Sequence, residues 1–370
     1  MRCVQDLGVH ESSRNRGFRY LINVVCRCAP GLAFPGSGHP CRKDVAMRAV
    51  VLTSPGSPLD QIEVADPVAP PGGSVIDVLA CGICHSDLHA AAGDYPTTLP
   101  VILGHEVAGL HPTLGPVLVY ACWGCRKPDC WACSSGQEMI CPNATEAGLF
   151  KDGGYAERMA IPDDGYLVPL GDLDPAQAAP LACGGLTAYR AVDHTLPFLS
   201  SAQKPRALVL GAGGLGQYGL QFIKLRSDAE VVVVDASPDK RRIALELGAD
   251  HAVAPGEAEG LFTAVVDFVG ADATLEAAAA HVARQGIAVV VGLYGGSIPF
   301  GFGRVPHEAR FMSSIWGTRD QLGELVTLAQ QHTLHSTIEV IGLADAQHAH
   351  ERLHAGDVSG RFVIVPGNTA

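Results

Sequence analysis

Residues 207–216 read Ala-Leu-Val-Leu-Gly-Ala-Gly-Gly-Leu-Gly and decide the fold of the second half of the chain. The apolar start predicts a buried strand, and the residues behind it predict a helix over Gly214–Arg226. Gly211 permits a tight turn, Gly213 lets the backbone approach a pyrophosphate, and Gly216 lets strand and helix pack closely. Free N–H groups at the start of the helix would face the phosphates, so this stretch predicts a dinucleotide site.

An acidic residue follows these glycines at the distance expected of the ribose-binding acid in a dinucleotide site. The next apolar strand ends in Asp235, about 20 residues further on. A carboxylate there would hold the ribose hydroxyls and repel a 2′-phosphate, so NAD is favoured over NADP. The alternative is a glycine-rich turn of some other α/β domain, which the combination of strand, helix and acid disfavours.

Strands and helices alternate from about residue 205 to residue 317. The expected elements are strands at 206–210, 230–235, 265–269 and 287–291, and helices at 214–226, 239–247, 273–283 and 320–330. Apolar, β-branched strands in this rhythm indicate a doubly wound parallel sheet that is covered on both faces. Residues 47–189 instead contain short apolar runs between Pro and Gly clusters, which indicates a β-rich region before the sheet.

The composition excludes several classes of protein. The 370 residues carry a formal net charge of −12, whereas a general nucleic-acid or anionic-membrane binder needs a basic face. With 47% hydrophobic residues the chain is not disordered. No apolar run reaches the roughly 18 residues of a membrane helix. We therefore expect neither nucleic acid nor membrane as a partner.

The first 46 residues differ from the rest, since they are rich in Arg, poor in acids and without a hydrophobic period. An organelle transit peptide is one alternative, which Asp6 and Glu11 disfavour. Met47 opens an alternating apolar segment. We expect residues 1–46 to be upstream sequence or a disordered extension that activity and stability do not require.

Several cysteines lie together in a loop rich in Gly and Pro. Thiolates spaced this closely suit a closed tetrahedral zinc site. The best four are Cys125, Cys130, Cys133 and Cys141, with Cys122 as a competitor for the first place. Free or disulfide-bonded cysteines are the alternative. Disulfides are disfavoured in the reducing cytoplasm, where we expect a nicotinamide enzyme.

A second set of potential ligands is dispersed along the β-rich region. It comprises Gly82-Ile-Cys84-His-Ser-Asp-Leu-His89, Gly104-His105-Glu106 and Leu181-Ala-Cys183. Three protein ligands with an open fourth position describe a catalytic zinc. Spacing alone does not assemble this trio, because a lone His or Cys is more often a core residue.

These segments make the chain resemble a known family. GICHSDLH, GHEVAG, the four-Cys loop, PLACGGLTAY, GAGGLGQ and GRFVIVP stand in the order of the zinc-dependent medium-chain alcohol dehydrogenases. The resemblance covers about residues 47–370. It implies an α/β protein with a GroES-like β-barrel catalytic domain at 47–188 and 319–370, and a Rossmann domain at 189–318.

The resemblance also implies roles for the metal ligands. Cys84, His105 and Cys183 would bind a catalytic zinc. Glu106 would be an occasional ligand, and Asp87 would orient His105. The four-Cys loop would bind a second, structural zinc.

A proton relay and a cofactor site follow from the same resemblance. Ser86, a cofactor ribose hydroxyl and His89 would form the relay. The residues implied to bind NAD are His85, Thr187, Gly211, Gly213, Gly214, Leu215, Gly216, Asp235, Lys240, Val269, Gly270, Gly292, Leu293 and Arg361.

Two departures from the family pattern stand out. The first two cysteines of the loop are separated by four residues instead of two, and Pro128 lies in the added stretch. By comparison with the family's usual spacing, about ten residues are also absent between Gly109 and Val117. A shortened barrel strand would leave N–H and C=O groups without ladder partners, so we expect a less stable catalytic domain and weaker activity.

The sequence thus predicts an NAD-dependent oxidoreductase that converts a primary or secondary alcohol into an aldehyde or ketone. A weakly active or non-catalytic NAD(H)-binding zinc protein, or a relative like the quinone reductases, is the alternative. Trp316 either lines the substrate pocket or packs in the core. The family forms dimers and tetramers, and Ser297–Phe302 would supply an edge strand for assembly.

Overall fold

A parallel sheet forms the second half of the chain, as its sequence pattern predicts. The computed structural model describes residues 46–358 and 360–368. In this part a six-stranded sheet has the order β13-β12-β11-β14-β15-β16, and every neighbouring pair is parallel. Its strands are β11 (Arg206–Leu210), β12 (Glu230–Val234), β13 (His251–Val253), β14 (Phe262–Asp267), β15 (Val282–Val290) and β16 (Arg310–Ser313).

The helices around this sheet are α5 (Gly214–Arg226), α6 (Pro238–Glu246) and α7 (Asp272–His281). The central strands β11 and β12 are buried along nearly their whole length, which is why they are continuous runs of Val, Leu and Ala. The predicted limits are met to within a few residues, except that β15 starts at Val282 and α7 ends before it.

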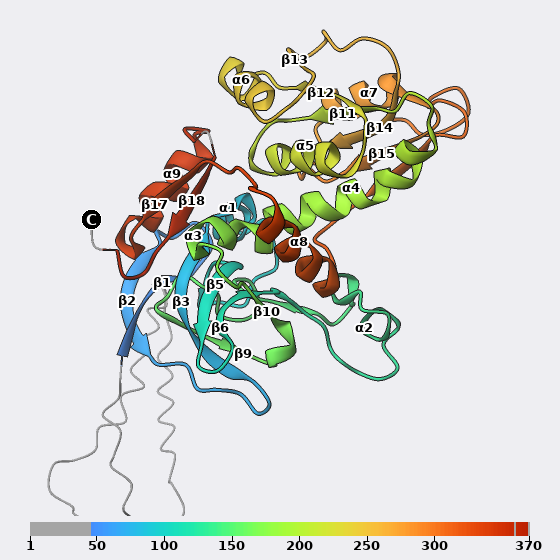
Figure 1. Cartoon of the computed structure of the whole chain (residues 1–370). Helices are drawn as coiled ribbons and strands as arrows, with labels where there is room; N and C mark the ends of the chain where they lie inside the picture. Colours follow the sequence, from blue (N-terminus) through green and yellow to red (C-terminus); the bar gives the residue numbers. More distant parts are fainter. Residues whose placement is uncertain (1–45, 359, 369–370) are drawn as a thin grey trace, which may run out of the picture. The chain divides into compact units, whose positions relative to one another are not determined.

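Within the described residues the β-rich region forms three further sheets, the smallest of which pairs β7 (Cys122–Trp123) with β8 (Thr145–Glu146). Another has the order β2-β1-β4, from β1 (Ala46–Leu52), β2 (Asp60–Ala65) and β4 (Val101–Ile102). The third has the order β10-β6-β5-β3-β18-β17, with β9 (Arg158–Ile161) also on β3. Its strands are β3 (Ser74–Gly82), β5 (Glu106–His111), β6 (Gly115–Val119), β10 (Leu167–Pro169), β17 (Ile338–Ile341) and β18 (Arg361–Ile364). The end of the chain therefore returns to the β-rich region (Figure 1).

The expected loss of ladder partners after Gly109 is wrong. Strands β5 and β6 form a tight hairpin in which Gly109 pairs with Val117 and His111 with Gly115. The other edge of β5 pairs with β3. In the turn, Nδ1 of His111 accepts hydrogen bonds from the N–H groups of Thr113 and Leu114, at 3.3 and 3.0 Å. The short hairpin thus supplies hydrogen-bond partners for the backbone N–H and C=O groups of β5, and no longer insert is needed for this.

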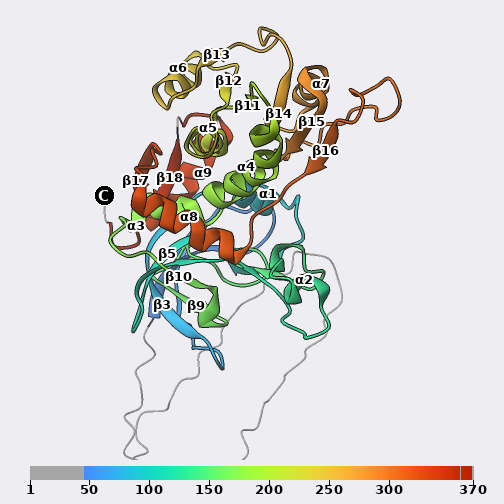
Figure 2. The ribbon, with the colours of Figure 1, turned by 45° about the vertical axis from the view of Figure 1, so that its right-hand side comes forward.

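One long helix, α4 (Gly184–Ser201), was not predicted. It runs between the antiparallel strands and the parallel sheet, and it contacts α5 and α8 (Arg319–Gln331) (Figures 1 and 2). Gly184, Gly185 and Pro197 read as helix breakers in the sequence, but burial of the helix overrides that preference. Because α4 crosses residue 189, the domain limits drawn from the resemblance stay a prediction.

One further expectation differs from the structure, and another lies almost wholly outside the described residues. Ser297–Phe302 is loop, and the edge strands of the parallel sheet are β13 and β16 instead. The prediction for residues 1–46 falls outside the described residues except for Ala46, where β1 begins. Across the described ranges, none of the helices combines the length and the hydropathy that a membrane crossing requires.

Candidate metal and dinucleotide sites

The dispersed ligand candidates come together at one buried point. Cys84 precedes helix α1 (His85–Ala92), His105 precedes β5, and Cys183 precedes α4. The potential ligand atoms of these three residues and of Glu106 lie within 4.8 Å of one another, and all four residues are buried. Two thiols and an imidazole at this separation are a donor set that zinc prefers.

Electrostatics at this cluster favour a metal ion. A hydrogen bond with Cys183 holds the pKa of Cys84 well below its usual range, although burial opposes this. Nε2 of His105 is buried and has no hydrogen-bond partner among the described residues. Such an atom costs free energy unless it binds something. A cation at the centre would satisfy both the thiolate and the imidazole.

Asp87 holds two of the ligand residues at once. Its Oδ2 accepts a hydrogen bond from the N–H of Cys84 at 2.8 Å, which caps helix α1. Its Oδ1 lies 3.4 Å from Nδ1 of His105, and both side chains are fully buried. The structure thus brings Asp87 to the place that the resemblance implies, behind the imidazole.

Glu106 and Arg361 form a buried ion pair beside the cluster. Nη1 of Arg361 donates to Oε1 of Glu106 at 2.6 Å, and the N–H of Gly184 donates to the same oxygen at 3.2 Å. Burial raises the pKa of Glu106 to about 7, although Arg361 acts against this. A Cβ added at Gly214 would lie 2.8 Å from Nε of Arg361, so this side chain also touches the start of α5. Arg361 therefore connects the metal cluster to the glycine-rich loop.

The relay residues lie on α1, directly after Cys84. Oγ of Ser86 is 3.8 Å from Sγ of Cys84. The ring of His89 is half-buried, and its Nδ1 is 2.8 Å from a carboxylate oxygen of Asp94. Sequence reasoning missed Asp94, which follows α1 after a left-handed turn at Gly93. The carboxylate fixes the orientation of the His89 ring.

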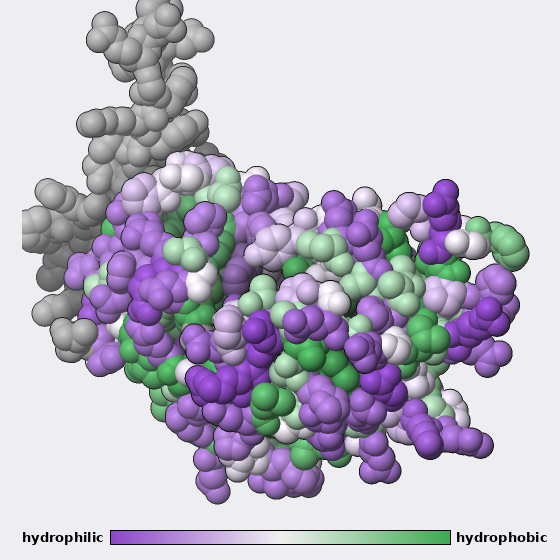
Figure 3. Space-filling view, turned by 90° about the horizontal axis from the view of Figure 1, so that it is seen from above, coloured by the Kyte–Doolittle hydropathy of each residue, from purple (hydrophilic) through white to green (hydrophobic). Residues whose placement is uncertain are grey.

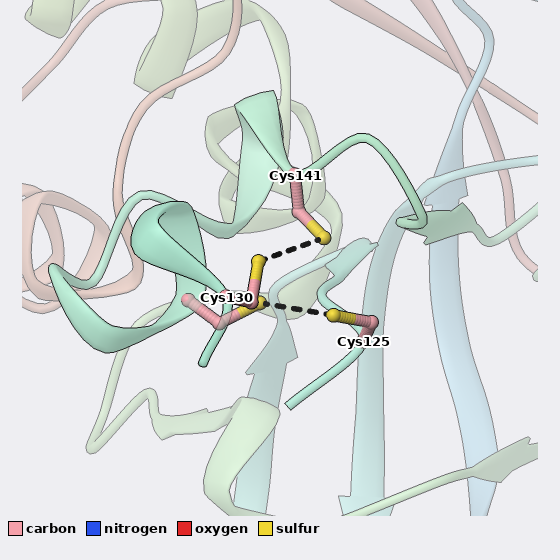
Figure 4. Close-up of side chains that lie close together, drawn as sticks. Cys125, Cys130 and Cys141 are labelled. Carbon is pink, nitrogen blue, oxygen red and sulfur yellow. Dashed lines mark hydrogen bonds between the residues drawn. The ribbon is translucent and has the colours of Figure 1, made fainter. Parts of the chain in front are cut away.

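The four loop cysteines form a second cluster. The potential ligand atoms of Cys125, Cys130, Cys133 and Cys141 lie within 4.8 Å of one another. Sγ of Cys130 faces Sγ of Cys141 at 3.7 Å, and Sγ of Cys125 lies 3.9 Å from that of Cys133 (Figure 4). Burial raises the pKa of Cys141, but backbone hydrogen bonds, among them one from the N–H of Asn143, lower it to about 7.

The loop also resolves the choice of its first cysteine. Cys122 is buried in the short strand β7 (Cys122–Trp123), where it pairs with Glu146 outside the cluster. Residues between Cys125 and Cys130 form a turn, with a left-handed residue at Arg126 and a hydrogen bond from the N–H of Cys130 to the carbonyl of Lys127. This turn absorbs the two added residues.

The glycine-rich loop lies at the C-terminal edge of the parallel sheet. Gly211 has φ +91°, and a Cβ at Gly216 would lie 1.8 Å from the carbonyl oxygen of Gly211. Within the described structure a Cβ at Gly213 would meet no atom within 4 Å. Internal packing therefore does not require a glycine at position 213. The free space there fits a pyrophosphate that approaches the backbone.

Three other predicted cofactor residues lie at the same edge, and two more lie on helices α1 and α4. Oδ2 of Asp235 accepts a hydrogen bond from the N–H of Ala212 at 2.8 Å, so the acid lies against the loop. Gly270 and Gly292 follow β14 and β15 and press together so closely that a Cβ on either would clash with the other turn. In α4, Thr187 is buried one turn after Cys183. His85 is exposed at the start of α1.

Trp316 contacts His105 of the buried metal-ligand cluster. Its ring is buried, lies edge-on to His105 with 5.3 Å between ring centroids, and has a left-handed backbone with φ 50°. Sequence reasoning left its role open, and it missed the buried side chains of Tyr155 and His350 behind Asp87. These two carry no spacing signal, because the fold brings them from distant segments.

Comparison with known proteins agrees with this geometry. A family model described as "Zinc-binding dehydrogenase" matches residues 214–331, and one described as "Alcohol dehydrogenase GroES-like domain" matches residues 70–172. The fold is thus a GroES-like domain combined with a Rossmann-like parallel sheet, as predicted.

Several individual proteins are similar over most of their length. An alcohol dehydrogenase of Geobacillus stearothermophilus is 33% identical over 86% of this chain and 98% of its own. D-arabinose 1-dehydrogenase (NADP(+)) of Saccharolobus solfataricus is 32% identical over 87% and 98%. The crystal structure of an alcohol dehydrogenase from Aeropyrum pernix superposes with a TM-score of 0.77 at 30% identity, covering 86% of this chain and 100% of that one. The chain belongs to the zinc-binding medium-chain alcohol dehydrogenase family.

Proposed function

We propose that the protein oxidises a primary or secondary alcohol with NAD, and reduces the corresponding aldehyde or ketone in reverse. The observation that carries the proposal is the buried cluster of Cys84, His105 and Cys183 with an unpartnered imidazole nitrogen. Arg361 connects this cluster to the start of the glycine-rich helix, so a metal and a dinucleotide would be neighbours.

The cluster is proposed to hold a catalytic zinc ion, with Glu106 as an occasional ligand. When bound in such a site, zinc acts as a Lewis acid that lowers the pKa of a hydroxyl group. The four-Cys loop is proposed to hold a second, structural zinc ion, because its four thiols close the coordination shell. The cofactor would carry the hydride chemistry, and the chain would supply position and electrostatics.

The protein's own side chains would move a proton and hold the groups of the site in position. Ser86 lies beside Cys84 and would accept the proton of the substrate hydroxyl. His89 reaches solvent and would release it, while the contact of Nδ1 with Asp94 holds the ring in place. Trp316 lies against His105 and would form one wall of the substrate pocket.

The cofactor would be NAD because Asp235 directly follows β12 and lies beside the loop. Its negative charge would repel the 2′-phosphate of NADP. We propose that the catalytic domain comprises residues 47–188 and 319–370 and the Rossmann domain residues 189–318, with α4 crossing the boundary.

The protein is also proposed to form a homodimer or homotetramer. In the described structure β16 is one of the two edge strands of the parallel sheet, and edge strands invite pairing. Phe300 and Phe302, in the loop before it, are 70% and 95% exposed. Figure 3 shows a face on which hydrophilic residues are mixed with hydrophobic patches, and contiguous exposed apolar groups can mark interaction sites.

The test combines an NAD-coupled activity screen over a panel of alcohols with zinc analysis of the same sample. We expect two zinc ions per chain and turnover of at least one primary or secondary alcohol. Full activity in a metal-free sample would contradict the mechanism. Zinc content without any turnover would instead favour a non-catalytic binding protein.

A further inference from the structure

A buried chain of polar side chains leads from the C-terminal part of the protein to the metal-ligand candidate His105. We propose that His350 is a positioning residue for this ligand, acting through Tyr155 and Asp87. The inference rests on the proposed function, because it concerns the metal site that the function requires.

Three contacts make up the chain. Nε2 of His350, in α9 (Ala346–His354), lies 3.2 Å from the hydroxyl of Tyr155. That hydroxyl lies 3.1 Å from Oδ2 of Asp87, whose Oδ1 is 3.4 Å from Nδ1 of His105. Tyr155, Asp87 and His105 are fully buried, and His350 is 5% exposed.

The contacts between His350, Tyr155 and Asp87 determine which group donates each hydrogen bond and which accepts it. The Tyr155 hydroxyl donates its single proton to Oδ2 of Asp87. The phenol oxygen must then accept from His350, which requires the tautomer with the proton on Nε2. Burial lowers the pKa of His350, so the ring is neutral near pH 7. Each proton in the chain thus points towards Asp87.

Asp87 needs this support because one carboxylate serves several partners. Its Oδ2 already caps α1 through the N–H of Cys84, and the Tyr155 hydroxyl is its second donor. Losing that donor would free the carboxylate to turn away from Nδ1 of His105. The orientation of a ligand imidazole depends on such outer contacts.

Packing alone does not explain a histidine at this position. The other buried residues of α9 are Ala346, Ala349 and Leu353, which are apolar. A leucine would fill the space without the cost of burying a polar ring. The ring of His350 meets that of Tyr155 edge-on, with centroids 5.8 Å apart, so its hydrogen bond is directed.

Tyr155 also holds His105 through the backbone. Its N–H donates to the carbonyl of Leu103 at 3.0 Å. Its ring occupies the space that a Cβ at Gly104 would need, at 2.4 Å. Replacement by Phe keeps the ring and these contacts, so Tyr155→Phe isolates the hydroxyl.

The experiment compares Tyr155→Phe, His350→Leu and His350→Gln in the full-length protein, with His348→Leu as the matched control. His348 lies on the same helix, but its side chain is 72% exposed. The readouts are the visible spectrum of the cobalt-substituted protein, the rate at which a chelator removes the metal, kcat and KM, and the melting temperature.

We expect Tyr155→Phe and His350→Leu to shift the cobalt spectrum, to speed metal loss and to lower kcat by up to roughly tenfold, the lower end of effects beyond the ligand shell. Gln keeps an N–H donor, so His350→Gln should recover most of the loss. The double variant Tyr155→Phe, His350→Leu should be no worse than Tyr155→Phe, because His350 acts through the hydroxyl.

The inference would be overturned if Tyr155→Phe and His350→Leu lowered the melting temperature but left the cobalt spectrum, the metal-loss rate and kcat unchanged. The series of contacts would then only stabilise the fold. Should His350→Leu not fold, Tyr155→Phe and His350→Gln still decide the matter. A wild-type protein that takes up no cobalt and turns over no alcohol would overturn the proposed function, and the inference with it.

Discussion

Two cysteines of this chain lie in clusters with different surroundings. Cys183 lies in the buried cluster with Cys84 and His105, whereas Cys133 lies in the less buried four-Cys loop. We expect Cys183→Ser to abolish turnover and to change the melting temperature little. Cys133→Ser should lower the melting temperature, because a structural zinc contributes folding free energy.

The measurements are metal content, kcat and thermal melting of each variant. In a domain of 150–250 residues, each kcal/mol lost lowers the melting temperature by about 2–4 °C, so the two effects are separable. If Cys183→Ser kept wild-type kcat, the buried cluster would not be catalytic. If Cys133→Ser kept full stability, the loop would not need its metal.

Asp235 is the residue on which cofactor choice depends. Asp235→Asn removes the negative charge, while an amide oxygen can still accept from the N–H of Ala212. We expect the ratio of kcat/KM for NAD over NADP to fall on the order of tenfold, which is about 1.4 kcal/mol. Asp239→Asn, an exposed neighbour in α6, is the control for charge alone. An unchanged ratio in Asp235→Asn would contradict the assignment.

At the scale of elements, two glycines of one loop have different reasons to be glycine. A Cβ at Gly216 would collide with the carbonyl of Gly211, whereas a Cβ at Gly213 would enter free space. Gly213→Ala should therefore keep the melting temperature and weaken NAD binding. Gly216→Ala should reduce both. Calorimetric titration with NAD and thermal melting measure the two effects, and equal NAD affinity of Gly213→Ala and wild type would refute the pyrophosphate reading.

The hairpin between β5 and β6 allows a second comparison of glycines. Gly115 has φ +74°, which costs an L-residue about 1–2 kcal/mol, so Gly115→Ala should destabilise the protein by that amount. Gly323 lies inside α8 with free space around its Cβ position, so Gly323→Ala should stabilise by about 0.5–1 kcal/mol. Denaturant unfolding measures both. Opposite signs are required, and a neutral Gly115→Ala would mean that the turn rearranges freely.

The elements also show what a sequence can and cannot predict here. Strand β11 and helix α5 match their predicted limits, because local period and glycine chemistry agree with the tertiary fold. Helix α4 was missed because Gly184, Gly185 and Pro197 oppose it locally, and only its burial against neighbouring elements favours it. The β5–β6 hairpin was misjudged because a comparison of motif spacing contains no information on pairing.

The candidate sites divide in the same way. The four-Cys loop is local, so its spacing predicts a cluster. His105 and Cys183 meet only after β5 and α4 have packed, and their proximity came from the family resemblance rather than from spacing. The Asp87–Tyr155–His350 contacts had neither signal, since a buried Tyr and His are ordinary core residues until their partners are known.

For the molecule as a whole, the remaining prediction concerns the extent of the chain that the fold needs. Strand β1 runs from Ala46, and a chain that starts at Met47 loses one of its pairings with β2, the one between Ala46 and Ala65. Met47 itself is buried and pairs with Val64. All members of both metal clusters and of the glycine-rich loop lie beyond this point.

We therefore expect the protein that starts at Met47 to keep the melting temperature, the metal content and the kcat/KM of the full-length chain. The matched comparison is a chain that starts at Thr53, which removes the whole of β1 and with it the partner of β2 and β4. That deletion removes the buried Val50, Val51 and Leu52, each worth roughly 1.5–3 kcal/mol when fully buried, and should unfold the β-rich region. A clear loss of stability or activity on removing residues 1–46 alone would show that this segment contributes contacts to the folded enzyme.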